Sequence, residues 1–185
     1  LRPDEESLCF SAVFTLNEEA EVLDKWFGRT VILSDRRFTY EEAQQIIETG
    51  KGDFAEEVLT LNRLAQRMRK TRFKRGAVSF QREEAKFKLD AEGKPLGVYF
   101  KEQKEANQLI EEFMLLANKQ VAEFCGHHKV NGRAVRRTMV YRVHDVPNEE
   151  KLEKFRTFVL RFGYVFKADK GRAVAKEMNK LLGQA

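Results

Sequence analysis

The sequence predicts an α+β fold of mixed α/β layers, in which an antiparallel-rich sheet packs against several helices. Strand-like and helix-like segments are interleaved along all 185 residues, an order that is typical of layered folds. Hydrophobic residues make up 42% and charged residues 34% of the chain, which excludes a disordered polymer and is enough to bury a core. No internal repeat or low-complexity linker interrupts the chain, so we expect residues 1–185 to form a single segment of one domain.

The first strands are predicted near the N-terminus. Residues 8–16 are rich in β-forming side chains and are followed by a turn. Residues 21–27 form a second such run, which Gly28 is expected to break, and residues 29–33 form a third. Together the three runs predict an antiparallel meander.

Two helices follow these strands. Thr39 and Glu42 have the spacing of a capping box, so a helix is expected to begin there and to end near Gly50. Asp53 opens the next helix. Its predicted buried stripe consists of Val58, Leu61, Leu64 and Met68.

The second half of the chain continues the interleaving. Its expected strands cover residues 77–80, 85–89, 96–101, 137–144 and 163–166, and its expected helices cover residues 105–124, 147–161 and 170–182. The turn at residues 91–95 joins two of these strands as a hairpin, and Gly126 stops the longest helix.

The long helix over residues 105–124 sorts into three faces at ~3.6 residues per turn. A wide apolar arc, an ordinary core face, contains Leu109, Ile110, Phe113, Leu116, Ala117 and Val121. The expected solvent face contains Gln108, Glu112, Lys119 and Glu123. Between them Asn107, Glu111 and Asn118 lie beside Met114. Amides and a carboxylate at the edge of a core favour a ligand-facing strip, although a capping network at a helix–loop contact is the alternative.

Positive charge is concentrated in one window. The net charge is +5, and residues 67–75 contain no acidic residue. The basic residues of this window are Arg67, Arg69, Lys70, Arg72, Lys74 and Arg75. Smaller basic groups are Arg36-Arg37 and Arg133, Arg136 and Arg137. A solvated helix face is the ordinary use of such residues, but a window of one sign favours phosphate contact and therefore a nucleic-acid partner.

Two aromatic residues lie beside basic ones. Tyr40 opens a helix just after Arg36-Arg37, and its acidic neighbours indicate an exposed position. Phe80 follows the basic window by five residues and precedes a polar stretch. Aromatic rings flanked by cations are the usual platform for stacking unpaired bases. Because the chain contains 15 Phe residues, burial in the core is the alternative for Phe80.

The sequence carries no pattern of a complete catalytic centre. Its aspartates are scattered singly, without the clustered carboxylates of a magnesium site. His127-His128 is read as a polar helix end, and Gly50-Lys51-Gly52 as a helix cap rather than a phosphate loop. Arg142 and His144 share one face of a predicted strand, where they could bind phosphate or pair with neighbouring acidic groups.

Three further features concern the compartment and the extent of the chain. No apolar run approaches the ~20 residues of a membrane helix, and the charged start does not resemble a signal sequence. Cys9 and Cys125 are isolated and are expected to be reduced, as in a cytoplasmic protein. The chain starts at Leu1 rather than Met, so we expect it to be cut from a longer protein.

Several motifs, in order, resemble the catalytic RNB domain of ribonuclease R and ribonuclease II. They are Leu1-Arg2-Pro3-Asp4 with residues 8–14, Phe38-Thr39-Tyr40, Phe87-Lys88-Leu89-Asp90 with Gly93-Lys94-Pro95, residues 109–118, and Tyr141-Arg142-Val143-His144 with Pro147. The resemblance spans nearly the whole chain, and the helix motif at residues 109–118 is its most specific part. It favours the ribonuclease R branch.

This resemblance implies a function that the chain alone does not complete. The family consists of processive enzymes that require magnesium and degrade single-stranded RNA from the 3′ end to nucleoside 5′-monophosphates. Its aspartate cluster precedes, and its essential arginine follows, the part that matches residues 1–185. We therefore expect a central piece of the catalytic domain that binds no Mg²⁺ itself and adjoins the remaining RNB, cold-shock and S1 domains. A non-catalytic module that binds single-stranded RNA is the alternative, and a structural or protein-interaction domain is a third possibility.

The resemblance also assigns roles to three residues. Tyr40 matches a tyrosine that stacks near the RNA 3′ end, Phe80 a phenylalanine that clamps the last bases, and Glu111 a glutamate that contacts a terminal sugar. Further possible RNA or phosphate contacts are Asn118, Arg72, Lys74, Arg75, Arg142 and His144. No catalytic and no metal-ligating residue is expected within the chain.

Overall fold

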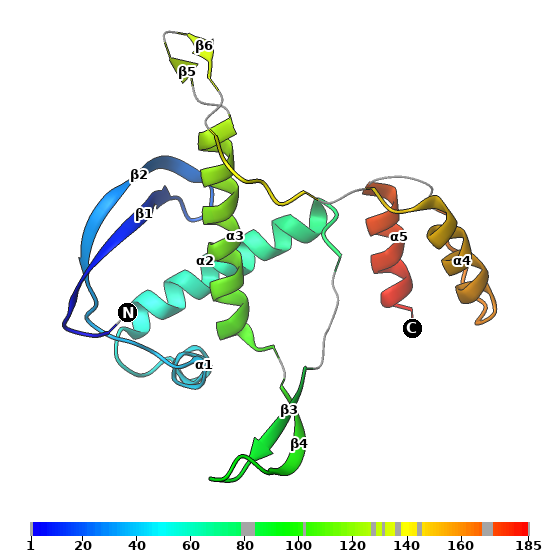
Figure 1. Cartoon of the computed structure of the whole chain (residues 1–185), viewed down its shortest axis with the longest axis horizontal. Coiled ribbons are helices and arrows are strands. Elements are labelled where there is room, and N and C mark those ends of the chain that lie inside the picture. The colour runs from blue at the N-terminus through cyan, green and yellow to red at the C-terminus, as the bar shows by residue number, and fades with distance from the viewer. Residues whose placement is uncertain are drawn as a thin grey trace. The chain divides into compact units, whose positions relative to one another are not determined.

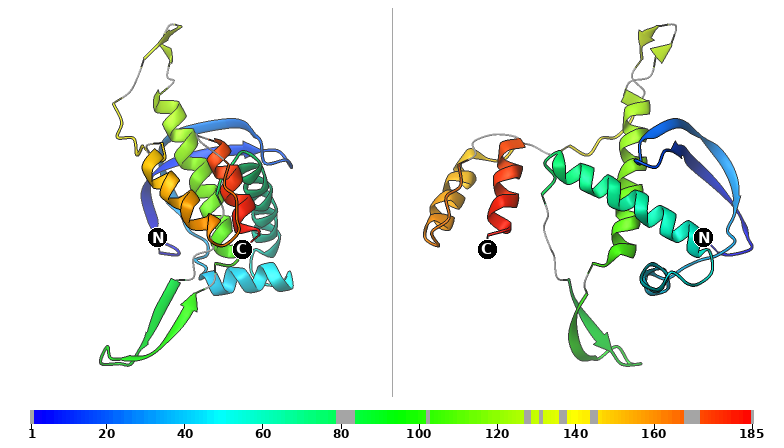
Figure 2. Two further views of the ribbon diagram at one scale, coloured as in Figure 1. Left: turned by 90° about the vertical axis from the view of Figure 1, so that its right-hand side faces the viewer. Right: turned by 180° about the vertical axis from the view of Figure 1, so that it is seen from behind.

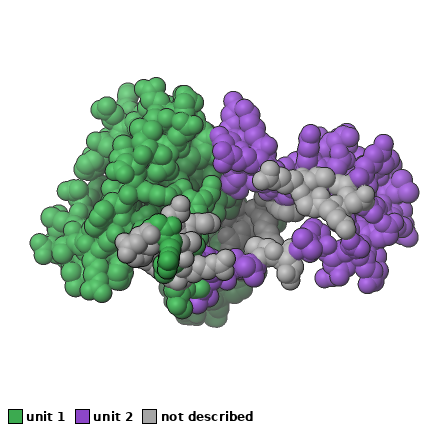
Figure 3. Space-filling view, turned by 90° about the horizontal axis from the view of Figure 1, so that it is seen from above, with its two compact units in different colours: residues 1–69, 82–139 green, residues 70–81, 140–185 purple. Residues whose placement is uncertain are grey.

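The computed structural model of the chain describes residues 2–78, 84–101, 103–126, 129–130, 132–135, 138–143, 146–167 and 172–184. These residues belong to two compact units (Figure 3). Unit 1 comprises residues 1–69 and 82–139, and unit 2 comprises residues 70–81 and 140–185. The described residues combine helices with antiparallel strand pairs, which confirms the predicted α+β class.

Unit 1 begins with a long antiparallel hairpin of β1 (Glu6–Leu16) and β2 (Val22–Leu33). The predicted break at Gly28 is wrong, because β2 continues through this residue and pairs it with Ser11. The indole ring of Trp26 lies where a side chain at position 28 would be, 2.3 Å from a Cβ built there. Glycine is therefore used here to admit an aromatic ring, and the expected three-strand meander is a two-strand hairpin.

The hairpin curves beside a long helix, α3 (Glu105–Gly126), as Figures 1 and 2 show. Phe27 of β2 packs on Phe124 of α3 with 4.8 Å between ring centroids. Lys25 Nζ donates a hydrogen bond of 2.7 Å to Gln120 Oε1. The two contacts join the hairpin to the second half of α3.

Helix α1 (Tyr40–Thr49) begins and ends as predicted. The Thr39 hydroxyl accepts from Glu42 N, and the Glu42 carboxylate accepts from Thr39 N at 2.8 Å, which completes the capping box. Gly50 ends the helix with a left-handed φ of 69°. Hydrogen bonds from Thr39 first, and the charge of Arg36 after them, lower the pKa of Glu42.

Helix α2 (Ala55–Lys74) crosses the first half of α3 (Figure 1). Val58 is buried, as predicted, but Leu61 is exposed, so the predicted stripe is wrong at that position. Its buried side consists of Val58, Asn62 and Ala65. The polar residue Asn62 lies on this buried side because α3 presents polar side chains where α2 crosses it.

The hairpin of β3 (Glu84–Leu89) and β4 (Pro95–Lys101) is confirmed. Asp90 shapes its turn by accepting hydrogen bonds from Glu92 N and Lys94 N through one carboxylate oxygen. Figures 1 and 2 show that this hairpin projects from the region where α3 begins. It thereby brings the end of β4 close to α1 and α3.

The strand expected over residues 137–144 is not formed by residues 138–143, the part of it that the structure describes. A short hairpin forms instead from β5 (Lys129–Val130) and β6 (Arg133–Ala134). Residues 138–143 have no regular secondary structure. This segment has alternating apolar side chains, but it pairs with no strand among the described residues and therefore forms no sheet.

Unit 2 contains α4 (Glu149–Leu160) and α5 (Arg172–Leu182), both at the expected places. Asn148 caps α4 by accepting a hydrogen bond from Lys151 N at 3.0 Å. Residues 163–166 do not form the predicted strand. They turn through Gly163, and the buried core then consists of Leu152, Val159, Phe166 and Val174. The apolar character of this segment thus reflects burial rather than strand pairing.

Within the described parts of the chain, no helix has the length and apolar character that crossing a membrane would require.

Candidate nucleic-acid interface

A cavity of about 370 Å³ lies in unit 1 where α1, the end of β4 and the start of α3 meet. We call it the Tyr40 cavity. Its lining residues are Tyr40, Glu41, Gln44, Gln45, Glu48, Phe100, Lys104 and Asn107. The lining therefore combines two aromatic rings with amides, carboxylates and one ammonium group, which can contact both the flat and the polar parts of a nucleotide.

Local hydrogen bonds hold the walls of the Tyr40 cavity together. Gln44 Oε1 of α1 accepts from Ala106 N at 3.0 Å, which fixes α1 against the first turn of α3. Asn107 Oδ1 accepts from Lys104 N at 3.3 Å and so caps α3 from within. Lys104 Nζ lies 3.9 Å from Glu48 Oε1 across the cavity lining.

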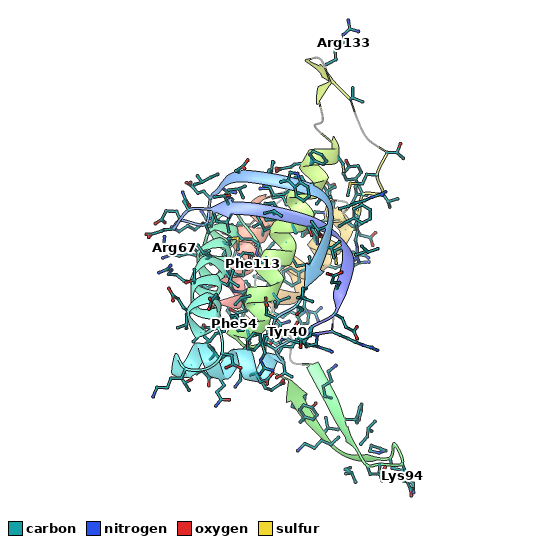
Figure 4. The ribbon with its side chains drawn as sticks, turned by 90° about the vertical axis from the view of Figure 1, so that its left-hand side faces the viewer. Tyr40, Phe54, Arg67, Lys94, Phe113 and Arg133 are labelled. Carbon is teal, nitrogen blue, oxygen red and sulfur yellow. The ribbon has the colours of Figure 1, made fainter. Side chains whose placement is uncertain are left out.

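Tyr40 itself is 43% exposed, as its position at the start of α1 predicts (Figure 4). The capping box fixes the backbone on either side of it. A partly exposed phenol ring on a rigid helix start can offer one face to a ligand. Its stacking role remains a prediction.

One partly exposed side of α3 continues from the Tyr40 cavity. It consists of Asn107, Ile110, Glu111, Met114 and Asn118, which we call the α3 strip. At about 100° per residue these positions share one side of the helix. Ile110 and Met114 are exposed, so the expectation that Ile110 lies in the core is wrong. The strip offers apolar surface flanked by amides and one carboxylate.

The expected solvent face of α3 is wrong at Glu112, which is only 3% exposed. Helix α2 covers this side of α3. Arg69 Nη1 of α2 lies 3.7 Å from Glu112 Oε1. Beyond the crossing, Lys119 is exposed as predicted. The helical period alone could not show where a second helix would cross.

Three polar contacts follow the crossing of α2 and α3, and we call them the α2–α3 seam. They are Asn62 Nδ2 to Glu105 Oε2 at 2.7 Å, Gln66 Nε2 to Gln108 Oε1 at 3.3 Å, and Arg69 to Glu112 at 3.7 Å. The same Nη1 of Arg69 is also 3.7 Å from Glu111 Oε2. The seam therefore ends at the α3 strip.

The basic window does not form one uniform surface. Arg67 donates to the Glu18 carbonyl and pairs with Glu19, which ties α2 to the turn between β1 and β2 (Figure 4). Arg69 belongs to the seam, and the guanidinium of Arg72 stacks 5.1 Å from the Phe73 ring. Lys74 and Arg75 are exposed. The structure thus gives its first two arginines internal roles in unit 1 and leaves the later cations, in unit 2, as candidates for phosphate contact.

Arg36 also has an internal role. It pairs with Glu42 at 3.1 Å and Asp53 at 3.5 Å and lies 5.1 Å from the centre of the Phe38 ring. It therefore braces the start of α1 beside Tyr40.

The remaining predicted positions are distributed as follows. Asn118 is exposed on the α3 strip, and Arg142 is exposed in unit 2. Phe80 and His144 lie outside the described residues, as do His127-His128 and Arg136-Arg137. Nothing in the sequence indicates that Phe100 and Lys104 would line the cavity. The sequence pattern places Arg69 in the basic window without indicating its contacts to Glu111 and Glu112. Phe100 alternates with Tyr99 on a predicted strand, but nothing in that pattern shows that α1 meets the strand end.

Among the residues that the structure describes, no group of three or more His, Cys, Asp or Glu side chains could hold a metal ion. Those residues do not fit the magnesium ion that the family resemblance implies. Cys9 and Cys125 are free and partly buried.

A model of the RNB domain family matches residues 1–184, nearly the whole chain. The chain belongs to the RNB domain family. This membership confirms the resemblance stated from the sequence motifs. The Tyr40 cavity and the α3 strip are accordingly features of an RNB segment.

Two curated relatives and one solved structure show how far the similarity extends. DIS3-like exonuclease 2 of Schizosaccharomyces pombe is 36% identical over 98% of this chain and 21% of that protein. A protein of Arabidopsis thaliana named inactive exonuclease DIS3L2 is 32% identical over 99% of this chain and 18% of that protein. The structure of Mycoplasma genitalium RNase R with ribose-methylated single-stranded RNA has a TM-score of 0.82 at 20% identity, covering 97% of this chain and 28% of that one.

The chain therefore spans about a fifth of the length of the curated relatives it matches. The structural match supports the fold of the segment. The sequence matches support its family.

Proposed function

We propose that this chain is the central part of the catalytic domain of a processive 3′→5′ exoribonuclease, and that unit 1 forms one wall of its RNA channel. The enzyme would hydrolyse single-stranded RNA to nucleoside 5′-monophosphates. The observation that carries the proposal is the Tyr40 cavity, where Tyr40 of α1, Phe100 of β4 and Asn107 of α3 come together. The exonuclease names of the relatives support the reaction class.

The chemistry of the cavity suits an unpaired nucleotide. Each base has a flat face that stacks on an aromatic ring, whatever its sequence. Asn107 and Gln44 provide amides close to the rings, and Lys104 provides a positive charge for phosphate. We infer that the terminal nucleotides of a single strand lie in this cavity.

The α3 strip would carry the strand onward from the cavity. Glu111 is one helical turn beyond Asn107, and a carboxylate can accept hydrogen bonds from ribose hydroxyls. The 2′-hydroxyl distinguishes RNA from DNA at such a contact. Glu111 therefore supports a preference for RNA, while Ile110 and Met114 offer apolar surface to sugars and bases.

Other parts of the longer enzyme would complete the reaction. We place the magnesium ion and the residues that hold it outside this chain, together with the remaining RNB, cold-shock and S1 domains. The two free cysteines support a cytoplasmic location.

The test compares two tyrosines of equal exposure in the full-length protein. Tyr40 and Tyr99 are each 43% exposed, but only Tyr40 lines the cavity. Tyr40→Ala should change the length of the smallest RNA product, because stacking at one nucleotide position is lost while the metal site is untouched. Tyr99→Ala should leave the product length unchanged. Product lengths are read by gel electrophoresis of an end-labelled oligoribonucleotide. Equal product lengths for wild type and Tyr40→Ala would contradict the proposal.

A second candidate function is a non-catalytic module that binds single-stranded RNA. The relative named an inactive exonuclease favours it, because that protein matches this chain almost as well as the relative named as an exonuclease. Incubation of the full-length protein with magnesium and labelled RNA separates the two candidates. Release of mononucleotides supports the exonuclease, whereas binding without hydrolysis supports the module. In either case the 185-residue chain alone should release no mononucleotides.

A further inference from the structure

One guanidinium group connects a buried carboxylate with an accessible one. Arg69 Nη1 lies 3.7 Å from Glu112 Oε1 and 3.7 Å from Glu111 Oε2. The side chain of Glu112 is 3% exposed, that of Arg69 is 21% exposed and that of Glu111 is 36% exposed. Accessibility thus increases from the α2–α3 seam to the α3 strip.

The buried carboxylate of Glu112 fixes the position of Arg69. An ionised carboxylate that is withdrawn from water is costly unless it is paired, so Glu112 requires a cation beside it. Arg69 reaches it from α2, and the neighbouring contacts of Gln66 and Asn62 keep the two helices in register. The same nitrogen, Arg69 Nη1, faces an oxygen of each carboxylate, and the guanidinium stays charged beside both.

The contact with Arg69 also restrains Glu111, the more accessible of the two carboxylates. A glutamate on a helix surface normally samples several rotamers, and ordering it costs conformational entropy. Glu111 has this cation on one side, and its side chain on the α3 strip is 36% exposed. The ion pair therefore restricts the rotamers that the Glu111 carboxylate can adopt.

We propose that Arg69 is a positioning residue, held by Glu112, that orients the Glu111 carboxylate to accept a hydrogen bond from a ribose 2′-hydroxyl. This inference rests on the proposed RNA contact of Glu111 and adds the residue that prepares it. Arg69 thus determines the preference for RNA over DNA through Glu111, without touching the nucleic acid. Its role differs from the phosphate contact suggested by its place in the basic window.

The test measures the affinity of the full-length protein for a fluorescent oligoribonucleotide and for the DNA of the same sequence. Binding is measured by fluorescence anisotropy in a buffer that contains a chelator, which prevents hydrolysis. The variants are Glu111→Gln, Arg69→Gln, Arg69→Lys and the double variant Arg69→Gln/Glu111→Gln. Arg67→Gln is the matched control, because Arg67 lies on the same helix and pairs with Glu19 instead. Melting curves accompany every variant.

Glu111→Gln should reduce the ratio of RNA affinity to DNA affinity roughly tenfold, since a hydrogen bond to a charged group contributes in this range. Arg69→Gln should reduce the ratio to a similar extent, and the double variant should reduce it no further, because Arg69 acts through Glu111. Arg67→Gln should keep the wild-type ratio. If Arg69→Gln does not fold, Arg69→Lys keeps a charge beside Glu112 and should show an intermediate ratio.

Three results would overturn the inference. In the first, Arg69→Gln or, where that variant does not fold, Arg69→Lys keeps the wild-type ratio while Glu111→Gln lowers it; the RNA contact then stands and only the positioning role fails. In the second, the double variant shows the product of the two single losses, which indicates independent roles. In the third, Glu111→Gln itself keeps the ratio, so the proposed ribose contact fails together with the role of Arg69.

Discussion

Two packing contacts, one in each unit, differ in kind. In unit 1, α2 meets α3 through the amides and charges of the α2–α3 seam. In unit 2, α4 and α5 belong to a cluster of buried apolar side chains around Phe166. Apolar packing stabilises without fixing direction, whereas hydrogen bonds and ion pairs fix direction at a cost in desolvation. The contact next to the candidate site is therefore the one that orients side chains.

The cost of the polar contact is visible in Asn62. Its Oδ1 atom is buried and has no hydrogen-bond partner among the described residues, although its Nδ2 atom donates to Glu105. An apolar pair at this crossing would avoid that penalty, so stability alone does not explain the seam. The proposed orientation of Glu111 by Arg69 would explain why the α2–α3 seam is polar.

Loss of a buried aromatic ring should destabilise unit 2 strongly. Phe166→Ala should destabilise unit 2 by about 3–5 kcal/mol, because Phe166 is buried among Leu152, Val159 and Val174. The exposed Leu160 serves as the control, and Leu160→Ala should change stability by less than about 0.5 kcal/mol. Denaturant unfolding measures both. Similar losses for both variants would contradict the assigned core.

The second prediction concerns the charges of unit 2. If Arg72, Lys74 and Arg75 meet phosphates, their replacement by alanine in the full-length protein should flatten the salt dependence of RNA binding. The slope of log affinity against log salt should fall by about 0.7 for each lost phosphate contact. Replacement of Lys51, Lys154 and Lys180 is the control for an equal change in net charge. An unchanged slope after replacement of Arg72, Lys74 and Arg75 would indicate that these residues form a solvated surface and do not contact phosphate.

Removal of the buried carboxylate of Glu112 tests the α2–α3 seam. Glu112→Ala should destabilise the chain by about 1–3 kcal/mol, because Arg69 loses its buried partner. The double substitution Arg69→Met/Glu112→Leu should restore stability, since a packed apolar pair can replace a buried ion pair. It should still lose the preference for RNA over DNA. Restored stability together with a wild-type preference would show that the seam does not orient Glu111.

Loss of the capping box beside Tyr40 should have a smaller effect. Thr39→Ala should cost about 1 kcal/mol through loss of the helix cap. The hydrogen bonds from Thr39 lower the pKa of Glu42, so its stabilising contribution is fully present above the ordinary value of 4.5. That contribution is lost as the pH falls through the lowered value of the folded state. The stability advantage of wild type over Glu42→Gln should therefore be present at neutral pH and vanish in acid, with Glu41→Gln as the control that keeps the cap.

Local signals in the sequence predicted the elements that depend on neighbouring residues. The capping box at Thr39 and Glu42, the turn at residues 91–95 and the end of α3 at Gly126 were correct for this reason. Gly28 and residues 163–166 were predicted incorrectly, because their structure depends on a ring lying over a glycine and on burial in a distant cluster. Such features come from tertiary packing, which local patterns do not contain.

The candidate site shows the same division. The helical period put Glu111 and Glu112 on different faces of α3, but it wrongly gave Glu112 to solvent, because the crossing by α2 is not encoded in α3 alone. The exposure of Tyr40 could be predicted from the charges around it. Phe100 and Lys104 could not be assigned to the same cavity, since their meeting with α1 requires the folded chain.

Photo-crosslinking can show whether the Tyr40 cavity and the α3 strip contact the 3′ end of single-stranded RNA. The full-length protein is irradiated with an oligoribonucleotide carrying 4-thiouridine near its 3′ end, and the crosslinked residues are identified by mass spectrometry. We expect crosslinks at Tyr40, Phe100 and the strip residues around Met114, and none at Tyr99, which has the same exposure as Tyr40. Crosslinks confined to other parts of the protein, with Tyr40, Phe100 and the α3 strip unmodified, would show that these residues do not contact the RNA 3′ end.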